Sequence, residues 1–298
     1  MGLEEHEAAR ALFRERAAAF LVDNRRGRRM DIRVGGRTIT LGPSRANGHC
    51  RVRMVLRPDP PDVLRDGIGA GVISCRVMLP ETDGRTIEGR IRLIPESGLT
   101  VVCDIDDTLK VSGVQDKKAL LRNTFLHRYR AVPGVKSLLR SLCEREAGVA
   151  FHYVSASPWQ LYPALSEFTR REGLPDGVFH LKTLRAKDRS ALAILGRPDE
   201  FKIGVIEPLL CAWPRRRFAF IGDSTERDPE IYGGLARRYP DRIAMIAIRS
   251  VKGSDTSEGR LARAFAGMAE HTMPVVGDGD RWAAAALSAA FTPADRRS

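Results

Sequence analysis

The sequence predicts an α/β fold: a Rossmann-like parallel sheet with helices on both faces, preceded by a small β-sandwich-like module. From about residue 99 onward, apolar segments alternate with helical stretches, as in a parallel sheet covered by helices. Over 30–98, short segments of alternating apolar and polar residues are instead separated by Gly, Pro, Asp and Asn, which is typical of antiparallel strands. We therefore expect three parts: a helix and basic linker over 1–29, the β module over 30–98, and an α/β domain with a C-terminal helical extension over 99–298.

Each expected element comes from its own stretch of the chain. A loosely periodic helix is expected over residues 3–22, and the arginine-rich run 25–29 follows it as a linker. Helices near 257–269 and 281–291 form the expected C-terminal extension. The strands of the parallel sheet are expected at 99–103, 149–154, 177–182, 217–222 and 242–248.

Charge and cysteine content narrow the classes of partner and compartment. Lys and Arg number 49 against 37 Asp and Glu, and the net charge of +12 favours nucleic acid, acidic lipid head groups or phosphorylated substrates. The five cysteines include no CxxC pair, which excludes a zinc or thioredoxin-like motif and indicates a reducing compartment. No apolar run approaches the ~20 residues that span a bilayer, so we expect a cytoplasmic protein whose membrane contact is at most peripheral. The arginine runs 25–29 and 215–217 are expected to be solvated faces, able to contribute ~1 kcal/mol per residue near an anionic leaflet.

Polar residues follow the predicted strands at their carboxyl ends. The segment CDIDDTLK (103–110) places three aspartates within four positions directly after an apolar run. Because ligands of open α/β sheets bind outside the carboxyl ends of the strands, polar residues that follow separate strands are expected to meet in one crevice. The residues expected to meet are Asp104, Asp106, Ser155, Lys202, Asp223 and Asp228.

The residue types in this set suit phosphoryl transfer. A carboxylate such as Asp104 can attack phosphorus and form an aspartyl-phosphate. Asp106 lies two positions further along an extended segment, hence on the same side, and can protonate the leaving oxygen. Clustered carboxylates become stable around a hard cation such as Mg²⁺, while lysine and hydroxyl groups neutralise the phosphoryl oxygens. The sequence therefore predicts a Mg²⁺-dependent phosphatase site.

The same residues resemble the motifs of a known superfamily. Asp104-Ile105-Asp106-Asp107-Thr108 resembles the DxDx(T/V) motif of the haloacid dehalogenase superfamily, and Ser155, Lys202 and segment 222–228 resemble its second, third and fourth motifs. Residues 98–252 are more narrowly similar to the catalytic domain of the actin-patch-associated phosphatidate phosphatase family, on the stretches DIDDTLKVSGV, FHYVSASPWQLYPALSEF and GDSTERDPEIYGGLARRYPDRI. Leu109 and Thr225 depart from that family's pattern, and neither position carries the chemistry.

The resemblance implies a role for each residue and an activity for the chain. Asp104 is implied to be the nucleophile and a Mg²⁺ ligand, and Asp106 the general acid and base, which also ligates Mg²⁺ through its backbone carbonyl. Ser155 and Lys202 are implied to bind the phosphate, and Lys202 also to hold Asp104. Asp223 is implied to bind Mg²⁺ directly, and Asp228 to bind it through water or to steer Lys202. The implied reaction converts phosphatidate, or a related lipid phosphate, to diacylglycerol and phosphate.

Neighbouring residues allow structural interpretations. Ser157 stands before a proline and three positions ahead of a glutamine, which predicts a helix N-cap rather than a phosphate ligand. Asp107 is expected to be a cap or a supporting group outside the site. Lys182 and Lys187 are alternatives for the third-motif lysine, and Lys110 fits a surface position as well as a substrate contact.

Two other functions remain open from the sequence. The first keeps the phosphatase chemistry but places the phosphate on a nucleic-acid end or a soluble metabolite, which the basic charge permits. The second is a membrane- or RNA-binding module with a vestigial acid site, against which the intact pair Asp104 and Asp106 argues. The segments between the motifs leave little room for a cap over the site, and an open site favours large substrates such as a lipid head group at a bilayer.

Overall fold

The structure, a computed structural model, describes residues 3–22, 24–34, 37–53, 71–183, 198–256 and 258–291. The chain divides into two compact units. The first comprises Met1–Leu21, Glu96–Lys182 and Ser190–Ser298, and the second comprises Val22–Pro95 and Thr183–Arg189. The three-part division drawn from the sequence stays a prediction. No helix within the described ranges has the length and apolar character needed to cross a bilayer.

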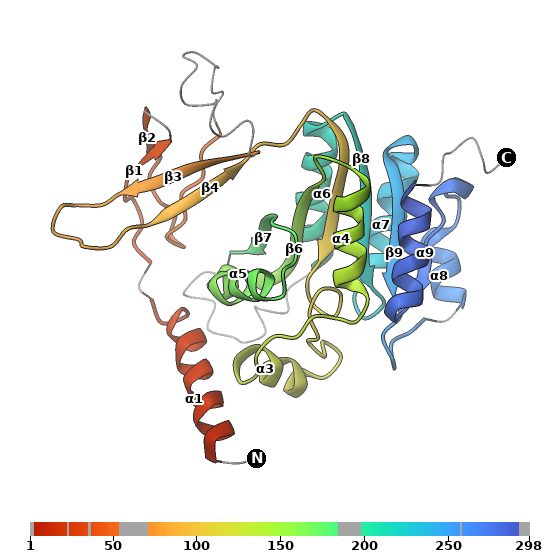
Figure 1. The fold of residues 1–298 in the computed structure, drawn as a ribbon, viewed down its shortest axis with the longest axis horizontal. Coiled ribbons are helices and arrows are strands. Elements are labelled where there is room, and N and C mark those ends of the chain that lie inside the picture. Colours follow the sequence, from red (N-terminus) through yellow and green to blue (C-terminus); the bar gives the residue numbers. More distant parts are fainter. Residues whose placement is uncertain are drawn as a thin grey trace. The chain divides into compact units, whose positions relative to one another are not determined.

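Among the described residues, six parallel strands form the sheet of the first unit, in the order β10-β9-β8-β5-β6-β7 (Figure 1). The strands are β5 (Ser97–Asp104), β6 (Ala150–Pro158), β7 (Val178–Lys182), β8 (Arg215–Asp223), β9 (Ile243–Arg249) and β10 (Val275–Gly277). The predicted α/β class is confirmed, and each of the five predicted strands is present. The sequence pattern does not predict β10, because three residues are too few to show a periodicity.

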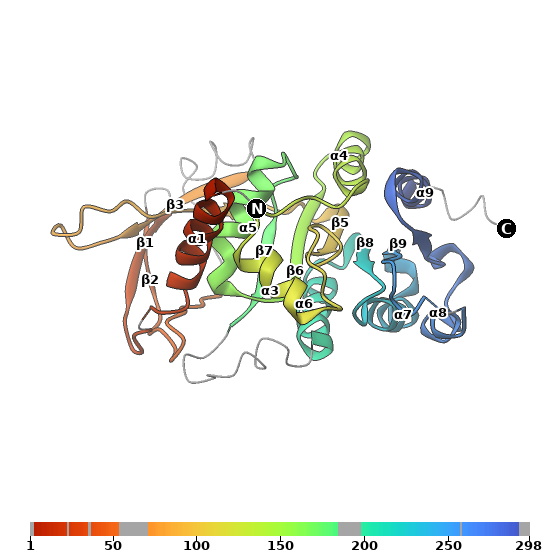
Figure 2. The ribbon, with the colours of Figure 1, turned by 90° about the horizontal axis from the view of Figure 1, so that it is seen from below.

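Helices cover both faces of this sheet, as Figure 2 shows in the view from below. One face carries α4 (Val135–Arg145), α5 (Tyr162–Arg171) and α9 (Gly279–Phe291), and the other carries α6 (Pro198–Ala212), α7 (Asp228–Arg238) and α8 (Glu258–Phe265). The alternation along β5 explains the two cores, since Leu99, Val101 and Cys103 enter the first and Val102 enters the second. The sheet is thus covered on both faces by helices. Ligands of such a sheet bind at the carboxyl ends of its strands.

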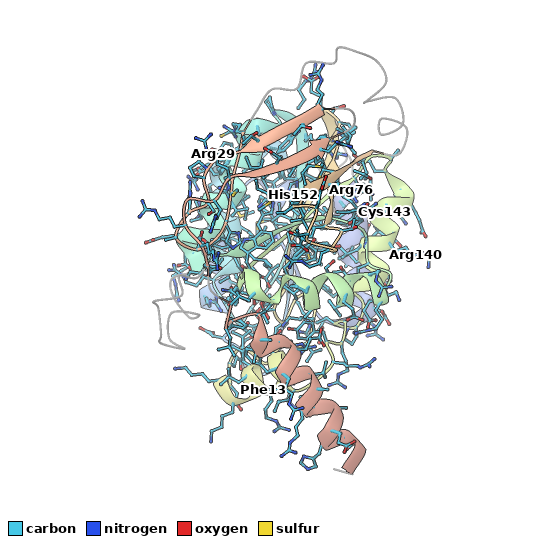
Figure 3. The ribbon with its side chains drawn as sticks, turned by 90° about the vertical axis from the view of Figure 1, so that its left-hand side faces the viewer. Phe13, Arg29, Arg76, Arg140, Cys143 and His152 are labelled. Atoms are coloured by element: carbon cyan, nitrogen blue, oxygen red, sulfur yellow. The ribbon has the colours of Figure 1, made fainter. Side chains whose placement is uncertain are left out.

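Two further helices lie near the carboxyl ends of the strands. α3 (Lys117–Phe125) is drawn below the sheet in Figure 1, and α1 (Leu3–Ala18) packs against it. Phe13 of α1, labelled in Figure 3, lies with its ring centroid 6.2 Å from that of Phe125 in α3. The buried Arg16 donates hydrogen bonds to the carbonyl oxygens of Thr124 (2.5 Å) and His127 (2.8 Å). The helix expected over 3–22 is confirmed, although it ends at Ala18.

The described part of the second unit contains an antiparallel sheet of four strands in the order β2-β1-β3-β4. Its strands are β1 (Met30–Val34), β2 (Arg37–Leu41), β3 (Val72–Met78) and β4 (Glu88–Arg92). β1 pairs with both β2 and β3, which confirms the predicted antiparallel character of this region.

The two arginine runs have different surroundings. Residues 25–29 are exposed, as expected for a solvated face. The prediction is wrong for Arg216, which is fully buried at the start of β8. Its guanidinium donates to Thr100 Oγ1 (2.7 Å) and to the carbonyl oxygen of Ser97 (2.5 Å), so it ties neighbouring strand starts together.

Candidate active site

The strand order brings the expected residues to one edge of the sheet. β5 lies between β6 and β8, with Asp104 beside Val154 of β6 and Cys103 beside Ile221 of β8 in the strand register. Ser155 follows Val154 directly, and Asp223 ends β8 two positions after Ile221. Both residues therefore reach the carboxyl edge at which Asp104 ends β5.

Lys202 connects the buried carboxylates at this edge. It extends from α6, its side chain is 1% exposed, and its Nζ lies 2.8 Å from Asp104 Oδ1 and 3.0 Å from Glu226 Oε2. Nζ also forms an ion pair with Asp228 Oδ1, at the first residue of α7. Burial alone lowers the pKa of Lys202, but the three carboxylates outweigh it and raise that pKa well above its ordinary value. Lys202 is therefore a permanent cation in the site.

Three carboxylates pair with this single ammonium, those of Asp104, Glu226 and Asp228. A fourth acid, Asp223, adjoins them through the hydrogen bond from its backbone N–H to Asp228. Burial, with the neighbouring acids adding to it, raises the pKa of Asp104 well above its ordinary value and that of Asp223 to about 7. One oxygen, Asp104 Oδ2, is buried and has no hydrogen-bond partner within the described residues. The cluster therefore holds more carboxyl groups than the single charge of Lys202 can stabilise as anions.

This surplus of carboxyl groups suits a hard divalent cation, which would stabilise them as anions. Oxygen atoms of Asp104, Glu226 and Asp228 lie within 4.8 Å of one another, and an all-oxygen donor set is the one that Mg²⁺ prefers. The unpaired Asp104 Oδ2 offers a ligand atom that Lys202 does not occupy. The residues present fit Mg²⁺, and the cofactor expected from the sequence stays a prediction.

Asp223 and Asp228 also contact each other. The backbone N–H of Asp223 donates to Asp228 Oδ2 (3.3 Å), and Asp223 Oδ1 accepts from the backbone N–H of Thr225 (2.6 Å). Thr108 Oγ1 donates to Asp223 Oδ2 (3.2 Å). These hydrogen bonds hold the segment that contains Asp223 and Asp228 against the segment that follows β5.

Asp106 lies in a different environment, in which both carboxylate oxygens are fully hydrogen-bonded. Oδ1 accepts from Lys110 Nζ (2.6 Å) and Ser112 Oγ (2.8 Å), and Oδ2 accepts from Ser155 Oγ (2.8 Å) and Ser157 Oγ (2.9 Å). Burial alone raises the pKa of Asp106, but the Lys110 charge and the hydrogen bonds outweigh it and hold that pKa well below its ordinary value. Asp106 is therefore ionised in this state.

The structure corrects the interpretation of Ser157. β6 continues to Pro158, a 3₁₀ turn covers Trp159–Leu161, and α5 begins only at Tyr162, so Ser157 caps no helix. Its hydroxyl instead contacts Asp106. The signal was present in the sequence, because residues two apart on an extended strand share a face and Ser155 was already assigned to the site.

Lys110 and Asp107 are both buried supporting groups. The surface position considered for Lys110 is wrong, since it is 1% exposed and paired with Asp106. The carboxylate of Asp107 accepts hydrogen bonds from the backbone N–H groups of Ser112 (2.8 Å), Gly113 (2.9 Å) and Val114 (2.7 Å). It closes the loop that follows the first motif, as expected of a group outside the site.

Among the competing lysines, Lys182 ends β7, and Lys187 lies outside the described residues. The sequence interpretation missed Glu226, which contributes a carboxylate to the cluster. Its position inside the acid-rich segment after β8 was the available signal.

Comparison with known proteins gives matches over this part of the chain. Residues 99–250 match the family described as "Phosphatidate phosphatase APP1, catalytic domain". Over 160 residues, 53% of this chain and 27% of the relative, the sequence is 33% identical to the phosphatidate phosphatase APP1 of Saccharomyces cerevisiae. Over 178 residues, 54% of this chain and 26% of the relative, it is 30% identical to an uncharacterized protein of Schizosaccharomyces pombe. The matched part of the chain spans about a quarter of the length of these relatives.

Proposed function

This chain belongs to the phosphatidate phosphatase APP1 catalytic-domain family, and from that membership we propose that it is a Mg²⁺-dependent phosphatase of phosphatidate or a related lipid phosphate. The observation that carries the proposal is the unpaired Asp104 Oδ2, a buried carboxylate oxygen at a strand end beside a permanent ammonium. Such an oxygen can serve as the nucleophile toward phosphorus or as a metal ligand. The cytoplasmic location and the peripheral membrane contact stay predictions.

The proposed reaction uses the residues in two steps. An oxygen of Asp104 attacks phosphorus, the bond from phosphorus to the lipid oxygen breaks, and Asp106 gives a proton to that leaving oxygen. Water then attacks the aspartyl-phosphate, Asp106 takes up a proton from it, and Asp104 is restored as phosphate leaves. Lys202 neutralises the phosphoryl oxygens, and Ser155 donates a hydrogen bond to one of them. Asp104, Asp223, Asp228 and the backbone carbonyl of Asp106 would hold Mg²⁺, which when bound would add to the neutralisation of phosphoryl charge.

The ionised state of Asp106 fits the second of these steps directly. To act as the acid of the first step it must take up a proton, and the negative charge of a bound phosphate favours that uptake. The hydroxyls of Ser155 and Ser157, which now donate to Asp106, can turn to the phosphate and leave the carboxyl less stabilised as an anion. Binding of the substrate therefore prepares Asp106 for its role as an acid.

The test is phosphate release from phosphatidate in mixed micelles, with Mg²⁺ and with EDTA. We expect release with Mg²⁺, and loss of release with EDTA or with Asp104→Asn. Asp241→Asn, at an exposed position in the 3₁₀ turn Pro240–Arg242, is the matched control and is expected to retain activity. Release that survives EDTA or Asp104→Asn would contradict the proposed mechanism.

A substrate panel separates the proposed function from its alternatives. Phosphorylated nucleic-acid ends, nucleotides and sugar phosphates are compared with phosphatidate under the same conditions. A higher kcat/KM for one of these would show that the preferred substrate is not a lipid. The proposed phosphatase mechanism would still hold. No release from any of them, together with salt-sensitive binding of liposomes or RNA by both wild type and Asp104→Asn, would favour a binding module.

A further inference from the structure

A pocket of about 150 Å³ opens directly beside Asp106. The polar end of the pocket is formed by Asp106, Ser155, Ser157 and Glu226. The rest of its lining is largely apolar. The catalytic carboxylates therefore adjoin a cavity that suits an apolar ligand.

The apolar walls come from three separate parts of the first unit. α3 contributes Leu120, Leu121 and Phe125, and the turn after β6 contributes Leu161. Phe20, which follows α1, completes the lining, with its ring centroid 5.8 Å from that of Phe125. Phe20 lies outside residues 99–250, the segment that matches the family.

Hydrogen bonds hold α1, and Phe20 that follows it, in place. Arg16 donates to the carbonyl oxygens of Thr124 and His127, at the end of α3 and just after it. Its guanidinium also lies 4.1 Å from the ring centroid of Tyr129. The position of α1 on α3, and with it that of Phe20, is therefore specified by buried polar contacts as well as by apolar packing.

The position of the pocket indicates which part of a substrate enters it. In the proposed reaction Asp106 protonates the oxygen that leaves phosphorus, so the organic group on that oxygen lies on the Asp106 side of the phosphate. Lys202 and Asp228 lie on the Asp104 side, and neither of them lines the pocket. The pocket begins at Asp106, and its apolar walls would bury an apolar group there and exclude a sugar or nucleotide, whose polar groups would lose their hydrogen bonds to water.

We propose that this pocket binds the apolar group esterified to the phosphate, and that Phe20, Leu121 and Phe125 determine the specificity of the site. The proposal rests on the phosphatase function proposed above and deepens it. An apolar cavity of this size holds a benzene molecule, so the pocket has room for about six carbon atoms of an apolar chain. Because Phe20 follows α1, the N-terminal helix contributes to the substrate specificity of the site.

The test uses n-alkyl phosphates from ethyl to octyl, kept below the concentrations at which they form micelles. Each methylene buried in the pocket is expected to raise kcat/KM about fourfold, until about six carbons are reached and the values level off. A kcat/KM that does not depend on chain length would overturn the pocket proposal and leave the phosphatase intact. No phosphate release from any alkyl phosphate or from phosphatidate would overturn the proposed function and this inference with it.

Variants separate the pocket from a general preference for apolar substrates. Leu121→Asp places a charge on a pocket residue whose side chain is half exposed, and it is expected to abolish the dependence of kcat/KM on chain length. Met273→Asp changes an equally exposed apolar residue that does not line the pocket, and it should retain the wild-type dependence. Wild-type dependence in Leu121→Asp would overturn the proposal.

A binding measurement provides a second readout. n-Alkyl phosphonates, which are not hydrolysed, are expected to bind the wild-type protein more tightly as the chain lengthens, over the same range of lengths. Phe20→Ala should weaken only the longer members of the series. Equal affinity for all chain lengths in the wild-type protein would overturn the proposal without reference to turnover.

Discussion

Lys110 Nζ lies 2.6 Å from Asp106 Oδ1, and the two side chains are only 2% and 11% exposed. Lys110 also donates to Ser112 Oγ (2.5 Å) and lies 4.9 Å from the ring centroid of Tyr129. A buried ammonium held this firmly fixes both the charge and the orientation of the carboxylate that faces it.

The first prediction is that Lys110→Met lowers kcat for phosphate release about 10- to 100-fold, because Asp106 loses the group that orients it for proton transfer. KM should change less, since Lys110 donates to Asp106 and Ser112 rather than toward the phosphate. The free energy of unfolding should fall by about 3–5 kcal/mol, because one partner of a buried ion pair is removed. Steady-state kinetics and urea unfolding measure the two effects.

Lys118→Met is the matched control for this change. Lys118 is exposed on α3, and both kcat and stability should stay close to the wild-type values. An unchanged kcat in Lys110→Met would show that Asp106 does not depend on Lys110 for its position.

A second prediction concerns Asp107, whose carboxylate accepts three backbone N–H groups and whose φ of 54° lies in the left-handed region. Asp107→Ala leaves these donors without their acceptor, and the free energy of unfolding should fall by about 3 kcal/mol. Asp107→Asn should cost less, because its single carbonyl oxygen can still accept from Ser112 and Gly113, which share Oδ1. Equal stability of the two variants in urea unfolding would contradict this assignment of the hydrogen bonds.

The sequence predicted the fold well because each long strand contains a largely apolar run. β5, β6, β8 and β9 are buried on both faces by helices, and their composition shows this directly. The positions of the polar residues at the strand ends could also be predicted. They follow from the parallel arrangement of the strands rather than from side-chain contacts.

Partners that come from elsewhere in the chain could not be predicted in this way. Arg216 is in a charged run, and its burial depends on backbone carbonyl groups of the neighbouring strand. Ser157 fits a capping pattern locally, and only the continuation of β6 turns it toward Asp106. Glu226 contacts Lys202 across a gap of 24 positions, which a local pattern does not contain. Local sequence patterns specified the elements, and tertiary contacts decided the details of the site.

A third prediction links Lys202 to the metal. Lys202→Met removes the ammonium from the four-carboxylate cluster, and without Mg²⁺ the free energy of unfolding should fall by about 3–5 kcal/mol. Mg²⁺ should raise Tm more in this variant than in the wild-type protein, because it then compensates a larger surplus of negative charge. Thermal unfolding with and without Mg²⁺ measures the difference. Lys182→Met, at the end of β7, is the matched control and should respond to Mg²⁺ as the wild type does.

An equal rise in Tm for Lys202→Met and the wild type would contradict this coupling. It would show that the cation binds away from the carboxylates that Lys202 contacts. Loss of phosphate release in Lys202→Met is expected whether or not Lys202 is coupled to the metal. The comparison of Tm values is therefore what tests the coupling.

The fourth prediction concerns Gly222, which precedes Asp223 in β8. A Cβ atom at this position would lie 2.7 Å from both Asp228 Cβ and Tyr232 Cε2, closer than such atoms approach. Gly222→Ala must therefore displace Asp228, whose carboxylate pairs with Lys202 and accepts from the backbone of Asp223. We expect a loss of about 1–3 kcal/mol in the free energy of unfolding, together with a fall in kcat of about tenfold or more.

Gly234→Ala, within α7, is the control that separates crowding from the loss of a glycine. The nearest atom to its added Cβ, apart from its chain neighbours and the backbone of its own helix, is Arg237 Nη2 at 4.0 Å, so nothing needs to move. Alanine is also favoured over glycine inside a helix by about 1 kcal/mol, so this variant should be more stable than the wild type and fully active. If Gly222→Ala retained full activity and stability, Asp228 would not need its present position against β8. The role of Asp228 in steering Lys202 would then have to be abandoned.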